Sequence, residues 1–237
     1  MERSPTVRTL ERDVIVNMAM SFVGGFVDAA GYIALWGLFT AHVTGNFVLI
    51  GAELISTSTG VLAKSLALPV FVLAVTLARL ISRAWQRRGR SPLSVLFGLE
   101  ALCLVGFLVF GLAFGPLASP DSAPAILSGM SAVAAMGLQN GIGRVALAHL
   151  PATTVMTVNV AQSVIDAVDL LVGMKAAEAK PAKERLMRMA PAILAFALGA
   201  FAGAFGVAHF SFACAAVPAL ILVVLATALR RKPTPVV

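Results

Sequence analysis

Charged residues are scarce in this sequence: Asp, Glu, Lys and Arg together make up 12% of its 237 residues, whereas hydrophobic residues make up 59%. Soluble domains usually carry about 25% charged residues. The shortage excludes an ordinary soluble domain and indicates that lipid is the main solvent of the protein. Cysteine is also scarce, because only Cys103 and Cys214 are present, both in apolar runs. They predict neither a disulfide framework nor a metal cluster.

Motifs of enzyme chemistry are absent from the sequence as well. It contains no H-E-x-x-H, no G-x-S-x-G and no nucleotide-binding glycine loop. These are the patterns that place zinc ligands, an acylated serine or a phosphate cradle in known enzymes. We therefore expect no enzyme, no cofactor and no metal site.

Long apolar runs are what the sequence has instead. A helix needs about 18 or more apolar residues to cross a hydrocarbon core. Six runs reach that length, at 14–36, 61–84, 92–116, 123–150, 188–209 and 211–229. The first run carries Asp28 in its interior and lacks a clean cleavage site, so it predicts a retained helix rather than a signal peptide. The expected fold is an all-α integral membrane protein with six transmembrane helices in a single membrane domain.

The basic residues are distributed unevenly. Of the 18 Lys and Arg residues, 16 fall in four segments: the N-terminal arm through Arg12, then 79–90, 175–188 and 230–232. The positive-inside rule assigns all four segments to the cytoplasm, together with both termini. No segment is long enough to build a folded basic surface, so the net charge of +7 predicts no nucleic-acid partner.

Two further stretches, 44–57 and 157–173, do not fit as full crossings. An even number of crossings must separate successive cytoplasmic segments, and each of these stretches would make the count odd. We therefore predict two re-entrant half-helices that enter the bilayer and leave on the same side. The break before the first one, at 39–45, must be buried in protein or line a polar cavity, because lipid cannot satisfy its backbone hydrogen bonds.

The chain also resembles itself. Asn140 lies 112 residues after Asp28, and Thr157, Asn159 and Asp166 lie 113 residues after Thr44, Asn46 and Glu53. The matching halves are repeat one, 14–116, and repeat two, 123–230. Because each half has three predicted crossings, the second copy is inverted, a layout common among secondary transporters. The two half-helix N-termini then approach each other near the midplane, each with about half a positive charge.

These helix ends define the candidate solute site. The positive ends favour an anion or a carboxylate, and Thr44 and Thr157 are natural N-caps. The proton-coupling candidates are Asp28, Glu53 and Asp166. The expected solute-binding residues are Asp28, Tyr32, Thr44, Asn46, Gln139, Asn140, Arg144, Thr157 and Asn159.

Each charged candidate has a second interpretation. Asp28 is either part of an ion or proton pathway, or a structural acceptor that caps the broken helix or pairs with Arg144. Arg144 either holds an anionic group or extends to the cytoplasmic surface. The acids of the half-helices, Glu53 and Asp166, either relay protons or reach water. Glu100 has no counterpart in the other repeat and is expected to be paired locally.

Two longer motifs resemble a known family. Residues 24–54, GGFVDAAGYIALWGLFTAHVTGNFVLIGAEL, resemble the signature of the YoaK-like bacterial membrane proteins, the domain of unknown function 1275. Residues 137–159, GLQNGIGRVALAHLPATTVMTVN, resemble the second half of that family. Val158 stands where the first repeat has Gly45, which predicts a less open second turn. The resemblance implies a multi-pass protein of the bacterial cytoplasmic membrane and implies no particular substrate.

Two functions fit these observations. The first is a secondary transporter or channel-like carrier of a small, anionic solute, coupled to protons. The alternative is a membrane sensor or assembly protein that transports nothing and whose polar interior only stabilises the broken helices. Six short spans leave little internal surface, which is compatible with a homodimer.

Overall fold

The computed structural model describes residues 5–56, 60–114 and 116–229, and within these ranges all regular secondary structure is helical. Arg3 and the basic tail 230–232 lie outside the described residues. In chain order the elements are α1 (Pro5–Ala34), α2 (Gly45–Ser56), α3 (Val61–Gln86), α4 (Leu93–Ala113), α5 (Ala123–Val145), α6 (Met156–Val172), α7 (Ala176–Phe210), the 3₁₀ helix η1 (Ser211–Ala215) and α8 (Ala216–Ala228).

Five helical segments of the described chain are long and apolar enough to cross a membrane, as expected for a multi-pass membrane protein. They are Glu11–Ala34, Val61–Gln86, Leu93–Ala113, Ala123–Val145 and Ala177–Ala228. The last segment contains the predicted span 188–209 and all but the last residue of the predicted span 211–229. The two spans are not separated by a loop, because the chain turns at Ser211 with a φ of 51° and continues through η1 into α8.

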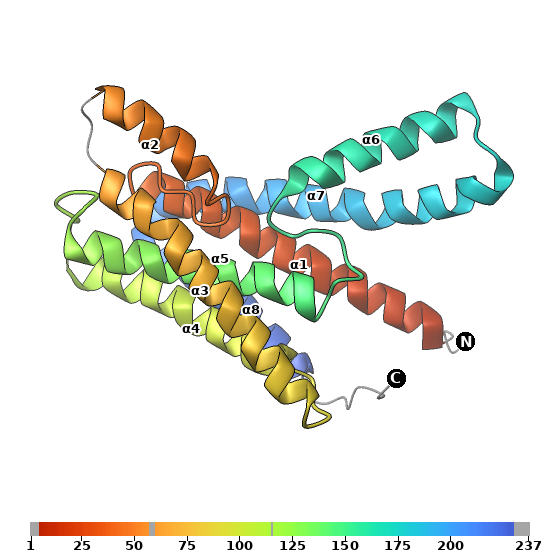
Figure 1. Cartoon of the computed structure of the whole chain (residues 1–237), viewed down its shortest axis with the longest axis horizontal. Coiled ribbons are helices and arrows are strands. Elements are labelled where there is room, and N and C mark those ends of the chain that lie inside the picture. Colours follow the sequence, from red (N-terminus) through yellow and green to blue (C-terminus); the bar gives the residue numbers. More distant parts are fainter. Residues whose placement is uncertain (1–4, 57–59, 115, 230–237) are drawn as a thin grey trace.

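Helices α1 and α5 form the centre of the bundle. In each, 67% of the most apolar 18-residue stretch is buried inside the protein, more than in the other three segments. Helix α1 packs along α7, and α5 packs along α3 and α4 (Figure 1). A side chain at Gly25 would meet the Phe196 carbonyl of α7, and one at Gly137 would meet Ala74 of α3. Small residues thus allow close helix crossings, as is typical of membrane proteins.

The short helices α2 and α6 follow the two predicted breaks and project from the bundle (Figure 1). Each packs on the helix that follows it, α3 or α7. Helix α2 begins one residue after Thr44, whereas α6 begins at Met156, with Val155 at its N-cap position. Thr157 is therefore not the N-cap that the sequence predicts. The backbone at Val155 is extended, so the helix starts before the threonine.

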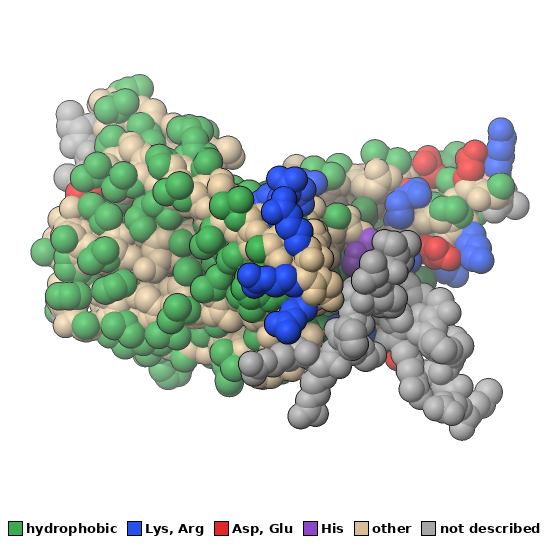
Figure 2. All heavy atoms as spheres, turned by 60° about the horizontal axis from the view of Figure 1, so that its bottom comes forward, with side chains coloured by type: hydrophobic (Ala, Val, Ile, Leu, Met, Phe, Trp, Pro, Cys, Tyr) green, Lys and Arg blue, Asp and Glu red, His purple; other side chains and the backbone are tan. Residues whose placement is uncertain are grey.

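The surface separates apolar from basic regions. Figure 2 shows hydrophobic side chains over the left of the molecule, and Lys and Arg side chains over the end of α3 and over the α6–α7 hairpin. The exposed cations at the end of α3 include Arg83, Arg87 and Arg88. This end of the bundle is thus suited to water and anionic headgroups, and the apolar surface in this view to lipid.

Candidate functional site

The first break, 35–44, is held by a carboxylate from α1. Asp28 is buried, and its Oδ1 accepts hydrogen bonds from the backbone N–H groups of Thr40 (2.9 Å) and Ala41 (2.7 Å). Its Oδ2 lies 2.5 Å from Nδ1 of His42. Two of the backbone donors that the break removes from helical pairing are therefore satisfied by one side chain. Asp28 is the structural acceptor that the sequence suggested, and its partner is His42 rather than Arg144.

The same break is fastened a second time from α2. The Asn46 side chain accepts from the backbone N–H of Phe39 and donates to the Phe39 carbonyl, both at 2.9 Å. The Asn46 amide thus makes the same pair of hydrogen bonds with Phe39 that two opposed residues of neighbouring antiparallel β-strands make. Further along α2, Glu53 lies 2.6 Å from the buried ammonium of Lys64, which also donates to the Trp36 carbonyl at 2.9 Å.

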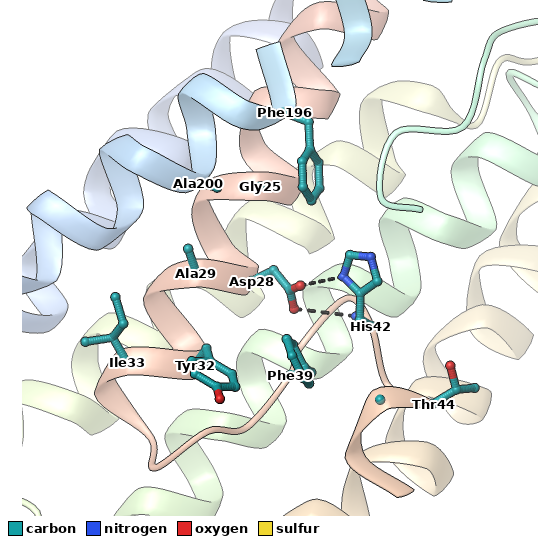
Figure 3. A pocket seen from close by; sticks show the side chains of 11 residues that line it. Gly25, Asp28, Ala29, Tyr32, Ile33, Phe39, His42, Thr44, Phe196 and Ala200 are labelled. Carbon is teal, nitrogen blue, oxygen red and sulfur yellow. Dashed lines mark hydrogen bonds and ion pairs between the residues drawn. The ribbon is translucent and has the colours of Figure 1, made fainter. Parts of the chain in front are cut away.

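A cavity of about 560 Å³ opens beside this break. Volumes of about 300–1,000 Å³ are usual for small-molecule sites. Figure 3 shows the Asp28 carboxylate and the His42 ring turned toward each other, with the rings of Tyr32, Phe39 and Phe196 around them. The lining residues are Gly25, Asp28, Ala29, Tyr32, Ile33, Phe39, His42, Thr44, Gly45, Phe196 and Ala200.

The buried part of the second break, 146–155, is held by neutral groups, while the exposed His149 pairs with Asp13 of α1. Asn140 of α5 accepts from the Thr154 hydroxyl at 2.9 Å. Gln139, which is fully buried, donates to the Thr153 hydroxyl at 3.0 Å and to the Met20 carbonyl at 2.9 Å. The amides of α5 thus hold the second loop against α1, as Asp28 holds the first loop.

Helix α6 repeats the bonding pattern of α2. Asn159 donates to the carbonyl of Ala152, seven residues earlier, at 2.8 Å, and the same spacing of seven separates Asn46 from Phe39. Asp166, like Glu53, pairs with a cation on the next helix, because Arg185 of α7 donates to it at 2.7 and 3.1 Å. Helix α6 is not among the candidate membrane spans, and Arg185 holds the pKa of Asp166 below its usual range.

A second, smaller cavity of about 190 Å³ lies at the second break. Arg144 is exposed there, one helical turn from Asn140. The ion pairs found among the described residues do not include Arg144. The lining residues are Gln139, Asn140, Gly143, Arg144, Ala148, Leu150, Pro151, Ala152, Thr153, Thr154 and Val155.

The predicted site residues therefore fall into three groups. Asp28, Tyr32 and Thr44 line the first cavity, and Gln139, Asn140 and Arg144 line the second. A third group lines neither cavity and consists of Asn46, Glu53, Thr157, Asn159 and Asp166.

Sequence reasoning missed some contributors to the first cavity and misjudged one acid. Phe196 comes from α7, far away in the chain, and no polar signal marks it. His42 carries no signal in the sequence beyond its ability to titrate, yet it is the direct partner of Asp28. Glu100 was expected to have a local partner. It is fully buried, and its carboxylate oxygens have no hydrogen-bond partner among the described residues.

The fold and the two broken hairpins define a polytopic helical membrane protein whose polar interior is built around chain breaks. The model of the family described as "Protein of unknown function (DUF1275)" matches residues 16–228, nearly the whole chain. The chain belongs to this family. No curated protein and no solved structure matches it.

Proposed function

We propose that this protein is a secondary transporter or channel-like carrier of a small solute in the bacterial cytoplasmic membrane. The observation that carries the proposal is the cavity beside the first break, which holds the Asp28–His42 pair against an apolar wall. An ionisable pair inside a membrane domain costs free energy of insertion and usually marks a pathway for an ion or a proton. The neutral loop anchors at the second break indicate that folding alone does not require such a charge.

The proposed architecture is an inverted repeat of three plus three crossings, with α2 and α6 as half-helices and both termini in the cytoplasm. Three observations support it. Helices α1 and α5 are equally enclosed. The pairing of α1 with α7 matches the pairing of α5 with α3. Asn46 and Asn159 each bond to the residue seven positions earlier.

In this proposal the solute enters the first cavity, and the Asp28–His42 pair releases a proton when the solute binds and takes one up when the solute leaves. Binding a proton makes the pair a carboxylate and an imidazolium with no net charge, whereas releasing it leaves one negative charge in the cavity. The second cavity, with Arg144 at its mouth, is the matching opening on the cytoplasmic side. The protein alternates between these two openings, as other secondary carriers do.

The test is solute-driven proton movement in proteoliposomes that contain a pH-sensitive dye. The panel consists of poorly permeant solutes: quaternary ammonium ions, carboxylates and nucleobases. We expect at least one of them to change the internal pH faster than in protein-free liposomes, and Asp28→Asn to abolish the change. Asp13→Asn serves as the matched control, because Asp13 also pairs with a histidine, His149, but at an exposed site. Equal rates for Asp28→Asn and wild type at every pH would remove the proton role.

One observation favours the alternative of a sensor or assembly protein. Helix α6 exposes Leu171 (86% exposed) and Val172 (82%) at the end that projects from the bundle, an apolar surface suited to another protein or to a second copy of the chain. This alternative predicts that no solute in the panel moves protons. It also predicts that Leu171→Glu abolishes capture of a partner while leaving the thermal stability of the isolated protein unchanged.

A further inference from the structure

The rings around the first cavity form a continuous series. The centroids of Tyr32 and Phe39 are 4.8 Å apart, those of Phe39 and His42 are 6.1 Å apart, and those of His42 and Phe196 are also 6.1 Å apart. They come from three segments: α1 supplies Tyr32, the break supplies Phe39 and His42, and α7 supplies Phe196. Figure 3 shows the rings bordering the space above and below the Asp28 carboxylate.

The charge of the cavity is one-sided. Asp28 is the lining residue with a fixed carboxylate, and none of the lining residues is Lys or Arg. The basic Lys64 bonds instead to Glu53 and to the Trp36 carbonyl, and neither of these residues lines the cavity. The remaining wall is Gly, Ala, Ile and aromatic side chains with the hydroxyl of Thr44. A ligand in this space therefore meets one negative charge and several ring faces.

We infer that the first cavity binds a monovalent organic cation, an ammonium ion with apolar substituents. This inference rests on the proposed carrier function and names the class of its solute. The positive group lies between the Asp28 carboxylate and the ring faces, whose quadrupoles attract cations. The apolar substituents contact Ile33, Ala200 and the Phe196 ring. Such aromatic enclosures are a usual way to bind quaternary ammonium ions.

Other ligand classes fit the cavity less well. An anion would be repelled by Asp28, which already accepts the N–H groups of Thr40 and Ala41 that an anion would need. The anionic solute predicted from the helix ends is therefore not the one this cavity selects. A metal ion would lack ligands, because the described residues contain no group of three His, Cys, Asp or Glu side chains able to hold one. A neutral apolar solute would make no favourable contact with the Asp28 carboxylate and would displace the water that solvates it.

The cation and the proton compete for the same pair. The titratable lining groups are Asp28 and Tyr32 from α1 and His42 from the break; α7 contributes only Phe196 and Ala200, and the start of α2 contributes Gly45. A cation replaces the proton of the Asp28–His42 pair without changing the net charge of the cavity. One organic cation therefore exchanges for one proton, and its affinity rises with pH.

The experiment is calorimetric titration of the purified full-length protein with four probes. Choline and benzyltrimethylammonium are the cations. The uncharged shape analogue of choline is 3,3-dimethylbutan-1-ol, and the anionic analogue is 3,3-dimethylbutanoate. We expect at least one of the cations to bind ten times more tightly than the alcohol, and the anion not to bind. Affinity for that cation should rise on raising the pH from 5.5 to 8.

Variants identify the groups responsible. Asp28→Asn keeps a side-chain oxygen that can accept from the loop and should reduce cation affinity at least tenfold, whereas Asp13→Asn should not change it. Phe196→Leu keeps an apolar wall and should reduce the affinity for the cation by about threefold to tenfold without changing the affinity for the alcohol. Thermal unfolding of each variant without probe establishes that it is folded.

Two outcomes overturn the inference: neither cation binds more tightly than the alcohol, or Asp28→Asn, correctly folded, binds the cation as well as wild type does. The carrier function is judged separately in the liposome assay. Cation binding without proton movement would uphold this inference and contradict the carrier. Proton movement driven by a carboxylate or a nucleobase, without cation binding, would uphold the carrier and contradict this inference.

Discussion

The two breaks of the chain perform the same structural task with different chemistry. The first, 35–44, is held by the carboxylate of Asp28, which accepts two backbone hydrogen bonds and contacts a histidine. The second, 146–155, is held by the neutral side chains of Gln139 and Asn140, which bond to threonine hydroxyls. The first break borders an aromatic cavity of about 560 Å³, and the second borders a cavity of about 190 Å³ with an arginine.

The difference separates structure from function. Because Asn140 matches Asp28 when the two halves of the sequence are aligned and bonds to Thr154 of the second break, a neutral side chain is enough to hold a break inside the bundle. The charge of Asp28 therefore needs another explanation, and the larger cavity around it provides one. The comparison also explains why the helix ends do not attract an anion at the first break: a protein carboxylate already occupies the backbone donors there.

The largest effect on stability is expected from Asp28→Ala. Removing the carboxylate leaves the buried N–H groups of Thr40 and Ala41 unsatisfied, which should lower the free energy of unfolding by about 3 kcal/mol. Asn140→Ala removes one hydroxyl bond and should cost about 1 kcal/mol. Reversible unfolding in mixed micelles measures both. Equal losses would show that the charge at the first break contributes nothing beyond what an amide provides.

The ion pairs on the short helices α2 and α6 should also differ. Lys64→Met leaves the Glu53 carboxylate, whose side chain is 16% exposed, without its partner. Burying a charge without a partner is costly, so we expect a loss of about 2 kcal/mol or more. Arg185→Met leaves the Asp166 carboxylate, which is only 2% exposed, but should lower the unfolding midpoint less, because Asp166 keeps the hydrogen bond from Gln162 and water reaches the place of the arginine, which is 46% exposed. The unfolding midpoints of Lys64→Met and Arg185→Met, each measured at low and at high salt, compare the contributions of the two ion pairs. A larger shift for Arg185→Met would show that the burial of the remaining carboxylate outweighs the exposure of the removed cation.

The asparagines at the starts of α2 and α6 provide a direct test of the repeat. Asn46→Ala removes two hydrogen bonds to Phe39, and Asn159→Ala removes one to Ala152. We expect the free energy of unfolding to fall by about 2 kcal/mol for Asn46→Ala and by about 1 kcal/mol for Asn159→Ala. Hydrogen exchange of the two loops should rise in the same order, each variant affecting its own loop. An effect of Asn46→Ala on the second loop would contradict independent repeats.

The smallest effect is expected from Thr157→Ala. Thr157 is exposed and is the second residue of α6 rather than its N-cap, so the free energy of unfolding should change by less than about 0.5 kcal/mol. A true N-cap would cost about 1 kcal/mol. The same unfolding assay distinguishes these values, and a loss near the larger one would restore the capping role.

The sequence predicted the class of fold and the position of both breaks because those features depend on local composition. Apolar runs identify membrane helices one at a time, and the polar residues around Thr44 and Thr157 mark where hydrocarbon stops. The internal match also paired Asp28 with Asn140, which the structure places in corresponding roles.

The contents of the cavities could not be predicted in the same way. Phe196 reaches the first cavity because α7 crosses α1 at Gly25, a contact between distant parts of the chain that no local pattern encodes. Lys64 was one of two cations outside the basic segments, yet only the fold shows that it is buried beside Glu53. Asn46 was assigned to the solute because an amide that binds a ligand and one that binds backbone look alike in sequence.

The close crossing of α1 and α7 has a mechanical consequence. A side chain at Gly25 would meet the carbonyl of Phe196, and side chains at Gly199 and Gly203 of α7 would meet the carbonyls of Phe22 and Phe26. We therefore expect these two closely packed helices, which both line the first cavity, to move together. Helix α2 packs chiefly on α3. It is connected to α1 by the first break, in which His42 contacts Asp28. We therefore expect α2, rather than α7, to move relative to α1. Spin labels on α2 and α7 should report changing distances during turnover, whereas labels on α1 and α7 should not.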